Sequence, residues 1–204
     1  MTSLLVRALD PSVEPPSDDV SGRILDAALE LAAASGIRNL TMDDVASRAR
    51  VGRMTVYRRF GDKATLVEAL TIRESRRCLE ELDAAIGPDA PIEDQVAAGF
   101  VTSLRLAREH PLLDRLGRFE PEAVLEALRA DGGAVFAAAR AFVAARLRAS
   151  QEAGVVGSID IDTAAELLVR VAVSFVLVRD TALPIDDDEE AADLARRLIA
   201  PMLM

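Results

Sequence analysis

The fold is decided by the stretch Leu40–Leu70, LTMDDVASRARVGRMTVYRRFGDKATLVEAL, which is typical of short helices separated by tight turns. One of these helices follows Thr41, whose side chain can cap the backbone N–H group of Asp44. Leu40 and Val45 stand on either side of this cap, where a hydrophobic staple would place them. The stretch therefore predicts a helix that starts directly after Thr41.

Two further helices are predicted in the same stretch. Arg50–Gly52 interrupts the helix that follows Thr41, and another short helix fits Arg53–Arg59. Gly61 then begins a longer helix with Asp62 as its cap. Upstream, SGRILDAALELAAASG from Ser21 has apolar residues at helical spacing and ends at a glycine suited to a C-terminal cap. Short helices in this order predict a helix-turn-helix unit.

The rest of the chain is also expected to be helical, which makes the fold class all-α. Alanine, leucine, arginine and glutamate dominate and aromatic residues make up only 3% of the chain, a composition that favours helix over sheet. We expect helices at 62–85, 91–109, 121–130, 133–153, 160–181 and 187–203, the last two capped by Asp160 and Asp186. The expected domains are a mobile tail (1–20), a helix-turn-helix domain (21–66) and a C-terminal helical bundle (67–204).

Charge is distributed unevenly along the chain. The formal net charge is −10, yet residues 21–77 hold eleven Lys or Arg against seven Asp or Glu. Residues 78–204 hold twelve against twenty-three. A basic segment is the electrostatic footprint of nucleic-acid binding, so we expect such binding at the helix-turn-helix unit alone.

The residue inventory argues against other classes of function. A single histidine, His110, with no nucleophile motif, glycine-rich phosphate loop or paired metal ligands, leaves little for catalysis, so we expect no enzyme, no cofactor and no metal site. The single cysteine, Cys78, cannot form an intramolecular disulfide. No apolar run approaches the ~20 residues that span a bilayer. We expect a soluble cytoplasmic protein with no membrane partner.

The helix at Arg53–Arg59 has two edges. Its apolar edge, suited to packing on the helix that begins at Ser21, consists of Val51, Val56 and Phe60. Its outer edge consists of Arg53, Thr55, Arg58 and Arg59, with Tyr57 between the two. In a major groove, arginine can bond guanine edges and threonine can touch a thymine methyl. Thr41 and Lys63 open the flanking helices, whose N-terminal N–H groups suit phosphate. The alternative is that these arginines form an ordinary solvated helix face.

The whole stretch Leu40–Leu70 resembles the DNA-binding region of the tetracycline-repressor (TetR) family. The shared features are the threonine opening the second helix, DVA, the valine before the recognition helix, the threonine–aliphatic–tyrosine step, the phenylalanine three residues later and the lysine three residues after that. The resemblance implies phosphate contacts from Thr41 and Lys63 and from the hydroxyl of Tyr57. The DNA-binding residues that it implies are Thr41, Arg53, Met54, Thr55, Tyr57, Arg58, Arg59 and Lys63.

Three positions depart from the family pattern. Arg50 replaces the glycine usual in the turn, which bears on the turn geometry and adds a charge near DNA. Gly52 replaces the usual Ser or Thr cap, which should weaken the recognition helix. Met54 stands where many members have a small residue, and it offers an apolar contact to a thymine methyl.

The apolar stretch TAAELLVRVAVSFVLVRD, at 163–180, has Glu166 and Arg170 as a favourable i,i+4 pair. Such a helix is either buried in the domain core or, as the resemblance implies, joins the 187–203 helix in a four-helix dimer interface. A twofold dimer would set two recognition helices ~34–36 Å apart and so require a palindromic site.

The resemblance also implies a cavity for a small-molecule effector among the middle helices. Side chains of these types more commonly belong to the core or the surface than to a ligand site, and the lining residues that we consider are Phe100, Ser103, Phe119, Phe136, Arg140, Phe142, Arg146, Arg170 and Phe175. The chain is thus expected to be a homodimeric regulator, a repressor that its unidentified effector releases from palindromic operator DNA. A helical protein-interaction module without specific DNA binding is the alternative.

Overall fold

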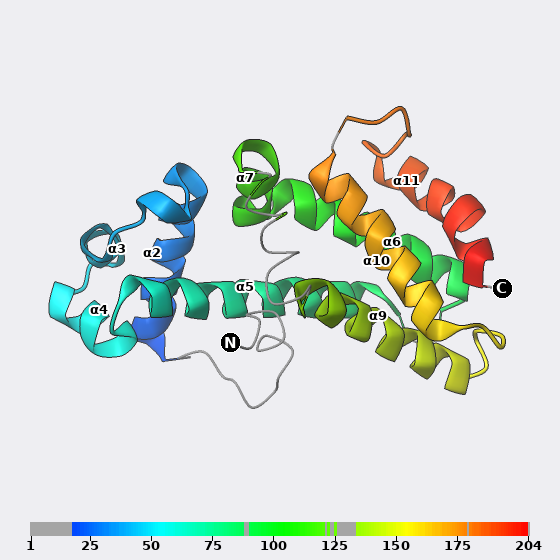
Figure 1. Ribbon diagram of the computed structural model, residues 1–204, viewed down its shortest axis with the longest axis horizontal. Coiled ribbons are helices and arrows are strands. Elements are labelled where there is room, and N and C mark those ends of the chain that lie inside the picture. Colours follow the sequence, from blue (N-terminus) through cyan, green and yellow to red (C-terminus); the bar gives the residue numbers. More distant parts are fainter. Residues whose placement is uncertain are drawn as a thin grey trace.

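A computed structural model describes residues 18–87, 90–120, 122, 125, 134–178 and 180–203, and within these the only regular elements are helices, which confirms the all-α fold. Figure 1 shows the long helix α5 running from a group of short helices at one end of the molecule to larger helices at the other. In chain order the elements are α2 (Asp19–Ser35), the 3-10 turn η1 (Ile37–Asn39), α3 (Met42–Ala49), α4 (Arg53–Phe60), α5 (Lys63–Ala85), α6 (Ile92–Glu109), α7 (Pro111–Phe119), α9 (Ala134–Glu152), α10 (Ile161–Leu177), α11 (Asp188–Leu194), the π-helical turn η3 (Ala195–Ile199) and the 3-10 turn η4 (Ala200–Leu203).

The head, residues 18–70, consists of α2, α3, α4 and the first two turns of α5. α3 and α5 start where the sequence predicted them. The Thr41 hydroxyl accepts a hydrogen bond from the N–H of Asp44 at 3.1 Å, and Asp62 accepts one from the N–H of Thr65 at 2.8 Å. The buried side chains of the head include Ile24, Leu25, Leu40, Val45, Val56, Phe60 and Leu66. Because α4 buries only one edge in this core, its other edge is left for solvent.

The turn between α3 and α4 is left-handed at Arg50, the position where the family pattern has glycine. Arg50 has φ 54° and ψ 46°, and its N–H group donates to the carbonyl groups of Ala46 and Ser47. A left-handed conformation costs a side-chain-bearing residue about 1–2 kcal/mol. Gly52 begins α4 without a side-chain cap, yet α4 is helical from Arg53 to Phe60.

Several boundaries differ from those predicted. α2 begins inside the predicted tail, because the carboxylate of Asp18 accepts hydrogen bonds from the first backbone N–H groups of the helix. α10 ends at Leu177, and α11 is capped by Asp187 rather than Asp186. Of the predicted tail, 1–17 lies outside the described residues, as does most of the helix predicted at 121–130.

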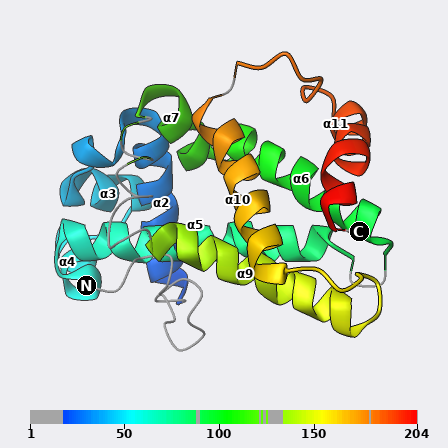
Figure 2. The ribbon, with the colours of Figure 1, turned by 45° about the vertical axis from the view of Figure 1, so that its right-hand side comes forward.

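Helix α7 was not predicted. The helix predicted at 91–109 ends directly before His110 and Pro111, but proline is also suited to a first helical turn because it needs no N–H partner there. The ring of His110 accepts a hydrogen bond from the N–H of Leu113 at 3.4 Å and so caps α7. Figure 2 shows α7 lying against α2, and Leu112 is buried in the core of the head.

The C-terminal bundle, α6 and α9 to η4, is built on α6 and α10 (Figure 1). Two apolar clusters hold it together. One joins α6 to α11 and η3 and includes Phe100, Leu104, Leu194 and Ile199. The other joins α9 to α10 and the C-terminal turn and includes Leu147, Ala165 and Leu203. Since α5 is continuous from Lys63 to Ala85, the head and the bundle share one helix.

Candidate nucleic-acid interface and apolar cavity

Helix α4 lies at the far end of the head (Figure 1), and its exposed edge is polar and basic. Val56 and Phe60 are buried, whereas Met54 is 76% exposed. Arg53 and Arg58 are also exposed, and Thr55 and Tyr57 are half-buried. Five of the predicted DNA-binding residues therefore lie together on the accessible part of one short helix.

Arg53 is held in place by two neighbours. Its Nε lies 2.9 Å from the Asp43 carboxylate of α3, and its guanidinium group lies 5.3 Å from the centre of the Tyr57 ring. The hydrogen bond with Tyr57, and then the charge of Asp43, raise the pKa of Arg53 above its ordinary value. Arg53 is therefore a permanent cation whose direction is set by α3 and by the next turn of α4.

Arg59 is turned toward α2. It forms an ion pair with Asp18 and donates to the Ser21 hydroxyl at 3.1 Å. Ser21 in turn donates to Asp18 at 2.8 Å, and this bond is the main cause that lowers the pKa of Asp18. Arg59 thus ties the recognition helix to the start of α2. The sequence reasoning missed this contact because Asp18 was assigned to the tail.

Lys63 and Thr41, the two predicted phosphate contacts, have partners within the head. The Lys63 ammonium group donates to the carbonyl oxygen of Arg38 at 2.7 Å. The Thr41 hydroxyl donates to the Asp44 carboxylate at 2.6 Å. Both side chains flank α4 in the chain, and each is already oriented by a hydrogen bond.

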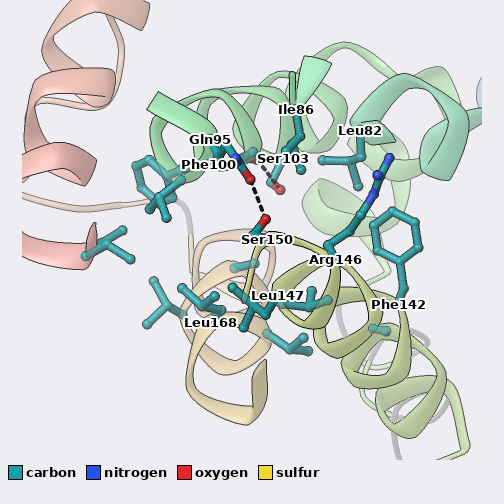
Figure 3. Close-up of a pocket in the computed structure, with 18 of the residues that line it drawn as sticks. Leu82, Ile86, Gln95, Phe100, Ser103, Phe142, Arg146, Leu147, Ser150 and Leu168 are labelled. Atoms are coloured by element: carbon teal, nitrogen blue, oxygen red, sulfur yellow. Dashed lines mark hydrogen bonds between the residues drawn. The ribbon is translucent and has the colours of Figure 1, made fainter. Parts of the chain in front are cut away.

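An apolar cavity of about 280 Å³ lies between α5, α6, α9 and α10 (Figure 3). Four of the nine residues predicted to line such a cavity do so: Phe100, Ser103, Phe142 and Arg146. In Figure 3, Phe142 and Arg146 of α9 lie on the same side as Leu82 of α5. The cavity is therefore enclosed partly by the helix that continues into the head.

The other five predicted lining residues do not line this cavity. They are Phe119, Phe136, Arg140, Arg170 and Phe175. Phe119 is 69% exposed, and the centre of its ring lies 5.4 Å from the Arg115 guanidinium group. Phe175 contacts Phe100 edge to face, with 5.5 Å between ring centres, and packs in the α6–α11 cluster. Helical spacing predicted that these rings pack but not against which neighbour.

The two arginines among these five are occupied on the outer side of α10. Arg140 lies 3.8 Å from the Glu166 carboxylate, and Arg170 forms a closer pair with the same group at 2.6 Å. The Arg170 guanidinium group also lies 5.0 Å from the centre of the Phe136 ring. The predicted i,i+4 pair of Glu166 and Arg170 is therefore present. Both arginines are paired with Glu166, and neither lines the cavity.

The polar residues that line the cavity are paired within the protein. Ser150 donates to the Gln95 side chain at 2.9 Å, the bond drawn in Figure 3, and Gln95 donates to the Ala90 carbonyl oxygen at 2.8 Å. The Ser103 hydroxyl donates to the Gly99 carbonyl oxygen at 2.7 Å. Gln95 and Ser150 were not predicted. A polar residue within an apolar helical stripe is the signal that could have identified them.

Among the described residues, no group of His, Cys, Asp and Glu has the geometry of a metal site, and no helix has the length and apolarity that a bilayer crossing needs. Burial, followed by the nearby carboxylates of Glu74 and Glu81, raises the pKa of Cys78 to about 11. Its thiol is therefore protonated at neutral pH and is a poor nucleophile.

Comparison with known proteins agrees with the arrangement of the head. Residues 24–70 match the model of the bacterial regulatory proteins of the tetR family. An HTH-type transcriptional regulator of Mycobacterium tuberculosis is 32% identical over 91 residues, which are 45% of this chain and 45% of that protein. The chain thus spans less than half the length of this relative.

Two longer matches extend into the bundle. The HTH-type transcriptional regulator AlkX of Mycobacterium tuberculosis is 27% identical over 183 residues, which cover 87% of this chain and 82% of that protein. The crystal structure of the TetR family repressor AlkX from Dietzia sp., implicated in biodegradation of n-alkanes, aligns with a TM-score of 0.61 at 25% identity, covering 89% of this chain and 96% of that one. The head of the chain thus carries the DNA-binding domain of the tetR family of bacterial regulatory proteins, and the chain as a whole is similar to regulators of that family.

Proposed function

We propose that this protein is a cytoplasmic transcriptional repressor that binds palindromic operator DNA as a homodimer and is released by a small molecule bound in the cavity. One observation carries the proposal. Helix α4 exposes a basic edge from a well-packed head, inside the segment that matches the family's DNA-binding model. No residue of the proposed mechanism is catalytic.

The DNA contacts divide into two kinds. Arg53, Thr55 and Arg58 have side chains that can read base edges in a major groove, and Met54 offers an apolar surface to a thymine methyl. Within the described part of the chain, Arg58 has no ion-pair partner that would compete with DNA. The proposed contacts to the DNA backbone come from Thr41, Tyr57, Arg59 and Lys63, and such contacts position the protein without reading sequence.

Dimerisation is supported by apolar side chains on the outside of the bundle. Leu167 of α10 is 41% exposed, and Leu198 and Met202 near the C-terminus are 63% and 49% exposed. Large apolar residues gathered at a surface mark interaction sites. A twofold dimer through α10 and the C-terminal helix would bury them and set two α4 helices ~34–36 Å apart, one turn of DNA.

Release by a ligand is supported by two connections between the cavity and the head. α5 lines the cavity with Leu79 and Leu82 and continues into the head. α6 lines it as well and leads into α7, where Arg115 donates to the carbonyl oxygen of Ala34 in α2 at 3.1 Å. A ligand that moves α5 and α6 would change the spacing of the two recognition helices, with a coupling free energy typically of about 1–3 kcal/mol.

Selection of bound duplexes from random DNA by the purified protein tests this proposal. We expect a palindrome, with a protein mass in solution equal to two chains and an affinity that falls steeply as salt rises, because bound phosphates release counterions. The double variant Arg53→Ala, Arg58→Ala should enrich no sequence. A wild-type protein that enriches no sequence and binds DNA independently of salt would instead support the protein-interaction module.

A further inference from the structure

We infer that the ligand of the cavity is an uncharged, mostly hydrocarbon molecule of about ten to twelve non-hydrogen atoms, whose polar group donates a hydrogen bond. The inference deepens the proposed function and rests on it in one respect, that the cavity is a binding site. It is carried by the size of the cavity, by the charge of its wall and by the hydrogen bonds that the wall has already made.

Size sets the scale of the ligand. An apolar cavity of about 150 Å³ holds one benzene molecule, which has six non-hydrogen atoms. The cavity between α5, α6, α9 and α10 has about 280 Å³, close to twice that volume. Its wall is formed largely by Leu, Ile, Val, Phe and Ala side chains. A dry wall of this kind favours hydrocarbon over a hydrated ligand.

Charge excludes acids and amines. Among the described lining residues, Arg146 is the only one with an ionisable side chain, and it forms an ion pair with Asp83. A carboxylate ligand would have to share the Arg146 guanidinium group with Asp83, and the two like charges would repel each other. An ammonium ligand would find no carboxylate in the wall. Burial of an unpaired charge is strongly unfavourable, so a neutral ligand is preferred.

The hydroxyl groups of the wall determine the polarity of the ligand. Ser103 uses its hydrogen to donate to Gly99, and Ser150 uses its hydrogen to donate to Gln95. Each hydroxyl oxygen then has only acceptor capacity left. A ligand hydroxyl can donate to either oxygen, whereas a ketone can donate to neither, and its own oxygen would have to reach the Arg146 guanidinium group instead. At the two serines the wall therefore favours an alcohol over a carbonyl compound.

Thermal unfolding of the full-length protein with four matched probes tests the inference. The probes are 1-nonanol, 2-nonanone, nonanoate and nonylammonium at neutral pH. At ten times its Kd, 1-nonanol should raise Tm by about 3–5 °C. The ketone should bind about three- to tenfold more weakly, and neither ion should raise Tm at the same concentration. Absence of a Tm shift with 1-nonanol, or a shift with nonanoate equal to it, would overturn the inference.

A pair of substitutions on α9 locates the bound molecule. Ala139 lines the cavity and Ala137 is exposed on the same helix. Ala139→Phe should fill the space and abolish the Tm shift, whereas Ala137→Phe should retain it. A shift that survives in both variants places the molecule elsewhere and overturns the inference. The probe series on the wild-type protein decides the ligand class even if Ala139→Phe fails to fold.

DNA binding measured in parallel separates this inference from the proposed function. If 1-nonanol raises Tm but leaves the affinity for selected DNA unchanged, the ligand class holds and ligand-controlled release fails. If the protein binds no DNA at all, the Tm series still decides the chemistry of the cavity. If DNA is released while no probe changes Tm, the assignment of the ligand class is wrong.

Discussion

Arg53 of the recognition helix is ion-paired to Asp43 of α3, with 2.9 Å between Nε and the carboxylate oxygen. The same carboxylate follows Thr41, a proposed phosphate contact, by two positions in the chain. If Arg53 contacts DNA as proposed, it must either leave Asp43 or bring this negative charge close to a phosphate. In either case we expect Asp43 to oppose DNA binding of any sequence.

Asp43→Asn should raise the affinity for duplex DNA of any sequence about two- to fivefold at low salt, because it frees Arg53 and removes repulsion of phosphate. The gain should shrink as salt screens the charge. Fluorescence anisotropy of a labelled duplex measures both effects. Asp188→Asn, an exposed site on α11, changes the net charge equally and is the control. An equal gain in both variants would assign the effect to net charge alone.

Lys63→Ala and Arg58→Ala should weaken binding in different ways. Loss of the Lys63 charge should reduce the affinity for selected and random DNA alike and lower the salt slope by about one, as expected of a phosphate contact. Loss of Arg58 should cost about 5- to 150-fold, chiefly at one base pair of the selected site. Titrations against selected and random duplexes at several salt concentrations distinguish the two. Arg58→Ala weakening both duplexes equally would refute its role in base reading.

Local patterns were sufficient to predict most of the head. The caps Thr41 and Asp62 and the buried edge formed by Val56 and Phe60 follow from spacing within a few residues, so they were legible in the sequence. The partner of Arg59 could not be predicted from the sequence, because Asp18 lies 41 positions away. The two side chains meet only when the start of α2 lies beside α4 in the folded head. The predicted site residues therefore came from helical periodicity and from the resemblance to the TetR family, whereas their orientation depends on tertiary packing.

The cavity shows the same limit more strongly. Gln95 and Ser150 are 55 positions apart and meet only when α6 packs against α9. Phe100 and Phe175 both have the spacing of an inward-facing ring, yet only Phe100 reaches the cavity. Helical periodicity identifies the face of a helix. It does not identify which of several packed helices that face will meet.

Arg50→Gly should stabilise the protein by about 0.5–1 kcal/mol, because glycine adopts the left-handed turn without strain and loses only part of that gain through its freer unfolded chain. Urea unfolding followed by circular dichroism measures the change. Arg48→Gly lies inside α3 and removes a 3.0 Å pair with Glu30, so it should destabilise by about 1 kcal/mol. Equal destabilisation by both substitutions would show that the turn carries no strain at Arg50.

Glu74 of α5 is buried where the head meets α7. Its carboxylate lies 2.6 Å from Arg73, 3.3 Å from Arg77 and 3.2 Å from the ring of His110. Arg73 also reaches Asp26 of α2 at 2.8 Å. Burial by itself raises the pKa of Glu74, but the His110 hydrogen bond and the charges of both arginines outweigh it and lower the pKa below its ordinary 4.5.

Glu74→Gln should therefore reduce the free energy of unfolding by about 1–3 kcal/mol at pH 7, as expected when hydrogen bonds to a buried charge are weakened. A lowered pKa means that the ionised carboxylate stabilises the fold above pH 4.5, its ordinary pKa, and that this contribution disappears as the pH falls through the folded pKa. The difference between wild type and variant should thus narrow below pH 4.5 in urea titrations. Glu80→Gln, exposed on the same helix, should change stability little at any pH. A pH-independent difference for Glu74→Gln would mean that packing, not charge, holds α5 against α7.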